Sequence, residues 1–479
     1  IVFERRGIQV ENKKNKLVEI LICMLTVLCS WVFFIVFLYA ANVKEVSIAE
    51  TVSSFIIFII CAFLSVALGC ILYRKVCAAS VFSIILAVLF TNFSIILTLI
   101  QKVFPQVRYW HLLYMGVILA ILLGSLAKRY TSQFLLAVKV VCVVYVGLIV
   151  VNLVTATPTI IRKMNVDING NSAQGELENQ GGGREGTNIY YLLCDEYGSF
   201  DQLMQEYGYE NAELRNCLVQ NGFNISENSF NYATGTHIIL SNLMSLDYVA
   251  DGDSTVVELD NYCKNGALHG ILSENGYTSR GVGETEWLGF EGTIDSQGGA
   301  QTADGESFET IALRNTFLSI AIQSNNSEAA QRIVDSLDDL MNMPINANSA
   351  EFVMIYIKAP HHPYYFKSDG SMNMPSKYNN VDGSNYESYL GEIEWLNGYL
   401  EKSITRIIEN DPECIIVLCS DHGNRFGTTY KSLSEKILNA IYYKGEERED
   451  IKDLSGINTI KYILNHEMGT DLEYTDDPE

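Results

Sequence analysis

Long apolar stretches in the first third of the chain limit its fold more than any other feature. Crossing a bilayer as a helix takes about 20 mostly apolar residues. Five stretches meet this requirement, at 17–41, 50–72, 77–100, 111–127 and 132–154. A secretory signal peptide would be one short stretch with a cleavage site. We therefore predict a five-helix transmembrane bundle over residues 1–154, and because the sequence begins at Ile1 we expect the natural start to lie upstream.

Charge divides the chain at the same place. Residues 1–154 contain 13 Lys or Arg against 5 Asp or Glu, and the rest contain 20 against 51, so the two parts carry +8 and −31. So acidic a surface repels nucleic-acid phosphates, and no nucleic-acid partner is expected. Basic residues gather in the leading segment and in the second and fourth connections. This pattern predicts a multi-pass protein of the plasma membrane whose part beyond about residue 155 is extracytoplasmic.

The acidic part begins with a segment rich in Gly, Asn, Gln and Glu, and we predict a flexible linker over 155–187. Beyond it, apolar runs of strand length occur at 189–194, 352–357 and 414–419. Segments with helical spacing separate them. Such alternation predicts that 188–479 is an α/β domain with a mostly parallel sheet. The eleven cysteines show no zinc-finger spacing, and we interpret them as buried residues without a disulfide framework.

Polar side chains follow each of the three apolar runs directly. Asp195 follows the first run, His361 comes shortly after the second, and Asp421 and His422 follow the third. Parallel strands place their carboxyl ends at one edge of the sheet, where open α/β sheets bind their ligands. Each residue alone has an ordinary explanation as a loop polar group, but their shared position predicts one site. Asp and neutral His suit one divalent ion, Mn²⁺ first, with Mg²⁺ and Zn²⁺ as alternatives.

Thr236 is the candidate nucleophile of this site. It precedes HIILSNLMSL, in which apolar residues recur at helical spacing, so its hydroxyl is expected at a helix N-terminus. Free amides and the helix dipole there stabilise an alkoxide or an incoming phosphate. The alternative is that Thr236 or Thr234 only caps the helix.

Four motifs together resemble those of a known family. They are NIYYLLCDEYG, the helix start at Thr236, HHPY at 361–364 and SDHG at 420–423. Preceded by five predicted spans, they resemble the membrane branch of the alkaline-phosphatase and sulfatase superfamily. That branch includes the lipoteichoic acid synthases and the lipid A phosphoethanolamine transferases.

The resemblance implies a role for each matching residue. Asp195, Thr236, Asp421 and His422 would be the metal ligands, and Thr236 would also be the nucleophile. Its spacing to the following helix matches the family pattern better than that of Thr234. His361 matches the histidine that contacts the substrate phosphate or leaving group.

Two further charged residues lie close to these motifs. Arg425 is a candidate substrate-binding residue, with an exposed loop charge as the alternative. Lipoteichoic acid synthases have Glu at the first ligand position, where this chain has Asp195 followed by Glu196, so a second ligand or a second metal stays open. The formylglycine motif of true sulfatases is absent, which disfavours sulfate-ester hydrolysis.

The function implied is metal-dependent transfer of a phosphoryl-linked head group from a membrane lipid to an envelope glycan or polymer, through a covalent intermediate on Thr236. A membrane-tethered hydrolase would use the same residues with water as acceptor. A catalytically inactive envelope scaffold is an alternative of another class. A transport role for the spans is disfavoured because Lys139 is near the end of a span and has no acidic partner in the others.

Overall fold

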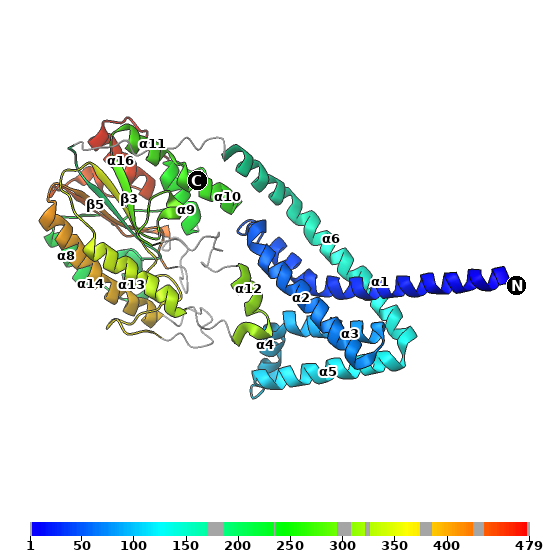
Figure 1. Ribbon diagram of the computed structural model, residues 1–479. Helices are drawn as coiled ribbons and strands as arrows, with labels where there is room; N and C mark the ends of the chain where they lie inside the picture. The colour runs from blue at the N-terminus through cyan, green and yellow to red at the C-terminus, as the bar shows by residue number, and fades with distance from the viewer. Residues whose placement is uncertain are drawn as a thin grey trace. The chain divides into compact units, whose positions relative to one another are not determined.

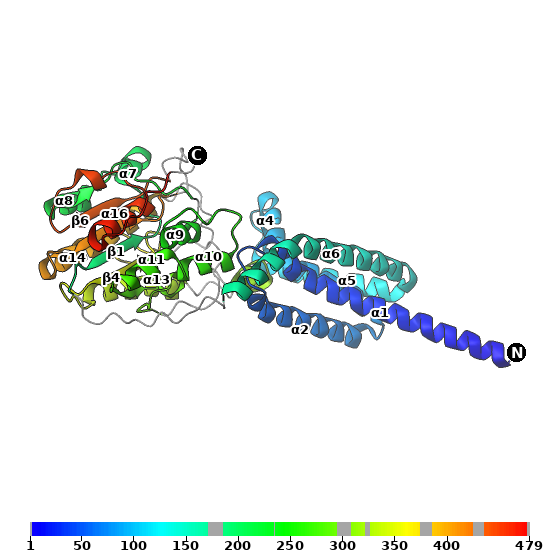
Figure 2. The ribbon, with the colours of Figure 1, turned by 90° about the horizontal axis from the view of Figure 1, so that it is seen from above.

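The computed structural model describes residues 2–170, 185–233, 235–294, 308–320, 326–373, 386–424 and 435–476. The chain forms two compact units. One contains Ile1–Asn165 and Gly299–Ser324, and the other contains Val166–Gly298 and Asn325–Glu479. Figure 1 and Figure 2 show the elements of each unit, which are described separately below.

The first unit is helical. Its main helices are α1 (Val2–Ala41), α2 (Ile48–Tyr73), α3 (Val76–Thr91), α4 (Phe93–Val103), α5 (Tyr109–Arg129) and α6 (Thr131–Gly170). Four described helices are long and apolar enough to cross a membrane, in α1, α2, α5 and α6, or up to five if the bent pair α3 and α4 is one span. Their core contains an aromatic cluster, in which the Trp31 ring lies 5.3 Å from that of Phe90. Since the indole N–H of Trp31 donates to Ser83 Oγ at 3.2 Å, this buried donor is satisfied.

The third predicted span, 77–100, is broken. Helices α3 and α4 meet at Asn92 with a bend of 72°. The Asn92 side chain donates to Val88 O at 3.0 Å, a local bond that competes with helix continuation. Beyond the break, Ser94 donates from its amide to Asn315 O and from its hydroxyl to Arg314 O. The sequence pattern therefore predicted one continuous helix where contacts with a distant segment favour two.

That distant segment contains α12 (Phe308–Arg314) and the short 3-10 helix η2 (Phe317–Ile320). Although it follows strand β3 (Thr278–Gly283) of the other unit in sequence, it packs into the core of the helical unit. Phe308 is buried there, and the Phe317 ring lies 4.9 Å from that of Phe90. The described residues 308–320, which the sequence pattern placed in the outer domain, thus belong to the helical unit. Helix α6 in turn continues to Gly170, into the segment predicted as linker.

The second unit is built on a six-stranded sheet with the order β2-β6-β5-β1-β4-β3. Its strands are β1 (Ile189–Cys194), β2 (Asn224–Ile225), β3 (Thr278–Gly283), β4 (Glu351–Ile357), β5 (Ile415–Ser420) and β6 (Asn439–Tyr443). Strands β5, β1, β4 and β3 are parallel to their neighbours within this group. Strand β6 is antiparallel to β5, and β2 is antiparallel to β6. The sheet is therefore mixed, with its parallel strands at the centre and at one edge.

Helices cover both faces of this sheet, as Figure 1 shows. One face carries α7 (Phe200–Tyr207), α8 (Ala212–Gln220), α13 (Asn326–Asn342) and α14 (Tyr386–Asn410). The other carries α9 (Thr236–Ser245), α10 (Val256–Lys264), α11 (Ala267–Glu274) and α16 (Gly456–Met468), with the short 3-10 helices η1 (Glu286–Leu288) and η3 (Glu449–Ile451). Alternate residues of β1 enter the two cores, and all six are buried. Burial on both faces explains why this strand reads as one continuous apolar run.

Candidate active site

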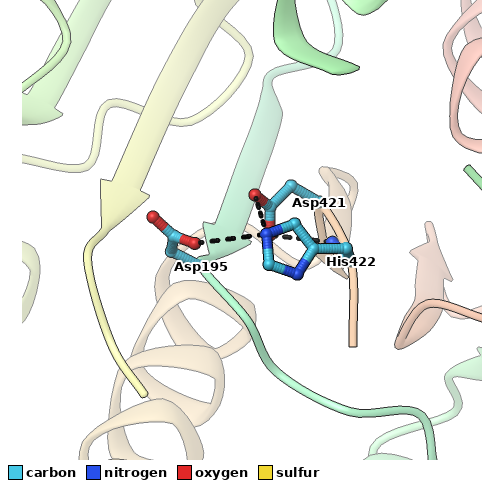
Figure 3. A group of neighbouring side chains, drawn as sticks. All are labelled: Asp195, Asp421 and His422. Atoms are coloured by element: carbon cyan, nitrogen blue, oxygen red, sulfur yellow. Dashed lines mark hydrogen bonds and ion pairs between the residues drawn. The ribbon is translucent and has the colours of Figure 1, made fainter. Parts of the chain in front are cut away.

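The ends of two neighbouring parallel strands bring three of the predicted ligands together. Asp195 follows β1, and Asp421 and His422 follow β5, in a register that pairs Cys194 with Ser420. One potential ligand atom from each of these three side chains lies within 4.8 Å of the others, and all three residues are buried (Figure 3). Sheet pairing thus brings together residues that are far apart in sequence, as their shared place after apolar strands predicts.

Thr236 joins the cluster from another element. It is the first residue of α9, as the apolar spacing predicts, and its Oγ1 lies 3.4 Å from His422 Nε2 and 3.5 Å from Asp195 Oδ1. The first backbone bond of this helix joins Ile239 N–H to Gly235 O. The amides of the three residues before Ile239 thus have no acceptor within the helix. An anion at Thr236 would meet these N–H groups and the positive end of the helix dipole.

Backbone contacts fix the orientation of His422. Its Nδ1 lies 2.8 Å from Gly423 O and must donate a proton to that carbonyl. In the neutral ring Nε2 is then an acceptor, which is the form that ligates a metal. This Nε2 lies 3.3 Å from Asp421 Oδ2 and 3.9 Å from Asp195 Oδ1.

Side chains from outside the cluster hold the loop that follows β5. The Gln202 amide exchanges two hydrogen bonds with the backbone of Asn424, at 2.7 and 3.1 Å. Asn231 donates to Asp421 O at 2.8 Å. A Cβ at Gly423 would lie 2.1 Å from Gln202 Oε1, so a larger residue there would displace the Gln202 amide from the Asn424 backbone. The ligand positions are thus set by packing of the loop as well as by strand register.

The two carboxylates of the cluster differ in their pKa. Burial, followed by the negative charge of Asp195, raises the pKa of Asp421 to about 7. Burial also acts to raise the pKa of Asp195, but His361, His422 and the Tyr356 hydroxyl outweigh it, and the net shift is downward. Two carboxylates this close to one another retain one proton between them near neutral pH unless a cation replaces it.

A divalent cation fits this donor set. Asp421 Oδ1 accepts two backbone N–H bonds, from Glu196 at 3.0 Å and from His422 at 2.8 Å. The other oxygen, Oδ2, is buried and has no hydrogen-bond partner among the residues described. A buried carboxylate oxygen without a partner is costly. Two carboxylates, one imidazole nitrogen and one hydroxyl are ligands that Mn²⁺, Zn²⁺ and Mg²⁺ accept.

The remaining predicted residues have different outcomes. His361 follows β4 near the cluster, where burial lowers its pKa and the Asp195 charge opposes that shift. The lowered pKa favours the neutral imidazole. Arg425 and Thr234 lie outside the residues that the structure describes. The Glu196 carboxylate accepts a hydrogen bond from the His362 amide at 3.3 Å and is not among the three clustered ligands.

The structure adds side chains that the sequence interpretation missed. The Tyr356 hydroxyl donates to Asp195 Oδ2 at 2.6 Å. The Trp287 ring lies 5.7 Å from that of Tyr356 and 4.7 Å from that of His237, the residue after the nucleophile candidate. Lys358 is the first residue after β4. Strand alternation would have placed Tyr356 and Lys358 on the face of Asp195, but only with the strand register known.

Several solved structures are similar to this chain at low sequence identity. Among solved structures, phosphoethanolamine transferase A (EptA) from Neisseria meningitidis is similar at 11% identity and a TM-score of 0.39, over 93% of this chain and 95% of that one. The periplasmic domain of EptC from Escherichia coli is similar at 13% identity and a TM-score of 0.40, over 61% of this chain and 84% of that one.

Lipoteichoic acid synthase LtaP from Listeria monocytogenes is similar at 12% identity and a TM-score of 0.36, over 63% of this chain and 77% of that one. No protein-family model matches the sequence, and no curated protein sequence matches it.

Proposed function

We propose that this chain is a membrane-anchored, metal-dependent enzyme that transfers a phosphoryl-linked head group from a membrane lipid to an envelope glycan or polymer through a covalent intermediate on Thr236. One observation carries the proposal. The Thr236 hydroxyl, at a helix N-terminus, lies within 3.5 Å of both Asp195 and His422, beside a buried oxygen of Asp421 that accepts no hydrogen bond from the described residues.

Asp195, Asp421, His422 and Thr236 would hold one divalent ion. When bound, such an ion lowers the pKa of a coordinated hydroxyl and offsets charge on a phosphate. Asp195 Oδ1, at 3.5 Å, accepts the hydrogen bond from Thr236 Oγ1 and orients this hydroxyl. The Nδ1 bond from His422 to Gly423 O keeps Nε2 free of a proton and turned toward the cluster. Neutral threonine is a poor nucleophile, so this arrangement is what makes its reaction feasible.

The first step forms a bond from Thr236 Oγ to phosphorus and breaks the bond from phosphorus to the lipid oxygen. The Thr236 proton is released to solvent, and the departing lipid oxygen gains a proton from the protonated form of His361. In the second step an acceptor hydroxyl attacks the same phosphorus, the bond from phosphorus to Thr236 Oγ breaks, His361 takes the proton of the acceptor, and Thr236 Oγ regains a proton from solvent. The free amides at the start of α9 can donate to the phosphate oxygens in both steps.

The apolar helices would hold the proposed site close to a lipid substrate. We propose that they span the plasma membrane several times, with the catalytic residues on the extracytoplasmic side. Anchoring converts a search in solution for a lipid into an encounter at high effective concentration. Such an arrangement suits a lipid donor better than a soluble one.

The test uses the full chain in detergent or nanodiscs, with labelled phospholipid, Mn²⁺ and an acceptor glycan. We expect a head-group adduct on Thr236 by mass spectrometry, and label on the acceptor. Thr236→Ala should abolish the adduct and turnover with metal content retained, whereas Thr236→Ser keeps a hydroxyl and should retain measurable activity.

The outcomes separate the alternatives. Label released to water even with acceptor present would favour the hydrolase. An unchanged rate in Thr236→Ala would remove the nucleophile assignment. Absence of stoichiometric divalent metal in the purified wild-type chain would favour the scaffold.

A further inference from the structure

Lys358 lies at the same sheet edge as the metal-ligand candidates. The register of β1 and β4 pairs Cys194 with Ile357, and the Asp195 amide donates to Ile357 O at 3.0 Å. Lys358, the next residue, is therefore the neighbour of Asp195 across the two strand ends. A cationic residue thus sits beside a group of buried carboxylates.

Strand alternation indicates the face on which Lys358 lies. The even-numbered residues of β4 from Phe352 to Tyr356 belong to the core cluster on the α9 side, and so do the odd-numbered residues of β1. Lys358 continues the first series and Asp195 the second. Both therefore occupy the face that carries Thr236. The Tyr356 hydroxyl, which reaches Asp195 Oδ2, shows that side chains of this β4 series extend to the site.

The charge of Lys358 acts on the site without being used in an ion pair. It contributes to the pKa shifts of Asp195, His237 and His361, three residues from three different elements. Within the described ranges, its half-buried ammonium makes no ion pair and no hydrogen bond. An ammonium beside carboxylates would ordinarily pair with one of them. Here it stays available to another anion.

A count of charges indicates what that anion is. Asp195 and Asp421 supply two carboxylates, and His422 is neutral as a ligand. One divalent ion leaves this ligand set without net charge, so it offers a phosphate ester no long-range attraction. Lys358 adds the positive charge that attracts a monoanion. The site then admits a monoanionic phosphodiester without a second metal ion.

We propose that Lys358 is a substrate-binding residue whose ammonium binds a non-bridging oxygen of the donor phosphodiester. The proposal rests on the function proposed above, because it assigns the substrate phosphate to the Thr236 site. It places a protein cation where a second metal ion would otherwise be required.

The experiment compares Lys358→Gln and Lys358→Arg with Lys402→Gln, which removes an exposed lysine of α14, as matched control. Two readouts use the Mn²⁺-loaded full chain: binding of inorganic phosphate by calorimetry, and hydrolysis of bis(p-nitrophenyl) phosphate. A charge-assisted hydrogen bond predicts that Lys358→Gln weakens phosphate binding by roughly 10- to 100-fold. We expect the loss mainly in KM, no loss of bound Mn²⁺, and substantial rescue in Lys358→Arg.

The outcomes test the role of Lys358 separately from the proposed transfer reaction. Phosphate binding and KM unchanged in Lys358→Gln would overturn the role of Lys358, whatever Thr236→Ala does. Equal losses in Lys358→Gln and Lys402→Gln would overturn it as well. Lys358-dependent phosphate binding with no turnover in the wild type would support the anion site and remove the proposed transfer reaction.

Discussion

The Tyr356 hydroxyl offers a direct test of the metal site, through Tyr356→Phe. This hydroxyl donates to Asp195 Oδ2 at 2.6 Å, and both residues are buried. The bond orients Asp195 and favours its ionised form, which is the form that binds a metal. A hydrogen bond to a buried charge contributes about 1.5–3 kcal/mol. At about 1.4 kcal/mol for each tenfold change, removing it should weaken metal binding by roughly 10- to 100-fold, the usual effect of losing a partner of a metal ligand.

Competition titration of the full-length protein with a fluorescent chelator measures this change for Mn²⁺ and Zn²⁺. Tyr442→Phe is the matched control, since the Tyr442 hydroxyl donates to Pro412 O at 2.7 Å, beyond the end of β5 opposite to the one that Asp421 follows. We expect the control to bind metal within about twofold of the wild type. Equal affinity in Tyr356→Phe and the wild type, or an equal loss in both variants, would refute the assignment of Asp195 as a ligand held by Tyr356.

Three other perturbations have defined expected results. Because the pKa of Asp421 is raised to about 7, a proton competes with the metal below that pH, so metal affinity should fall as pH decreases through about 7, and a flat profile in the same titration would contradict this. Burial raises the pKa of Glu392 well above its ordinary value, so the folded state keeps a proton that the unfolded chain releases, and stability declines as pH rises above about 4.5. Glu392→Gln should therefore unfold at a higher temperature than wild type at pH 8, with a weaker dependence of stability on pH. Phe308→Ala removes a buried ring from the helical unit, at a cost of about 3 kcal/mol or more, so proteolysis within 299–324 should become faster, and an unchanged cleavage rate would mean that α12 is not held by that ring.

The sequence alone predicted which side chains cluster at the sheet edge better than it predicted the side chains that support them. Asp195, Asp421 and His422 were predictable because each follows a fully buried strand, and parallel strands end at one sheet edge. Thr236 was predictable because α9 carries helical apolar spacing from its first turn. Lys358 and Tyr356 were missed, because their neighbours depend on which strands pair and in which register. Pairing is a long-range property that local periodicity does not contain.

The helical unit shows the same limit. Apolar length predicted the membrane helices, but it merged α3 with α4, since residues 77–100 are apolar throughout. The break at Asn92 depends on Ser94 bonding to carbonyls of Arg314 and Asn315, more than 200 positions away. Likewise, the antiparallel β6 resembles the parallel strands in sequence, because all five of its residues are buried. Contacts between segments that are remote in sequence determine these features, and a hydropathy pattern contains no information about such contacts.

The packing of α12 and η2 into the helical unit affects how the sheet-containing unit can be studied in isolation. A fragment begun after α6 would carry α12 and η2 without the helices that bury Phe308 and Ala312. Apolar side chains left facing water in this way promote association between molecules. Expression of a well-behaved water-soluble fragment therefore calls for replacing α12 and η2 with a short polar loop, in addition to removing α1 to α6.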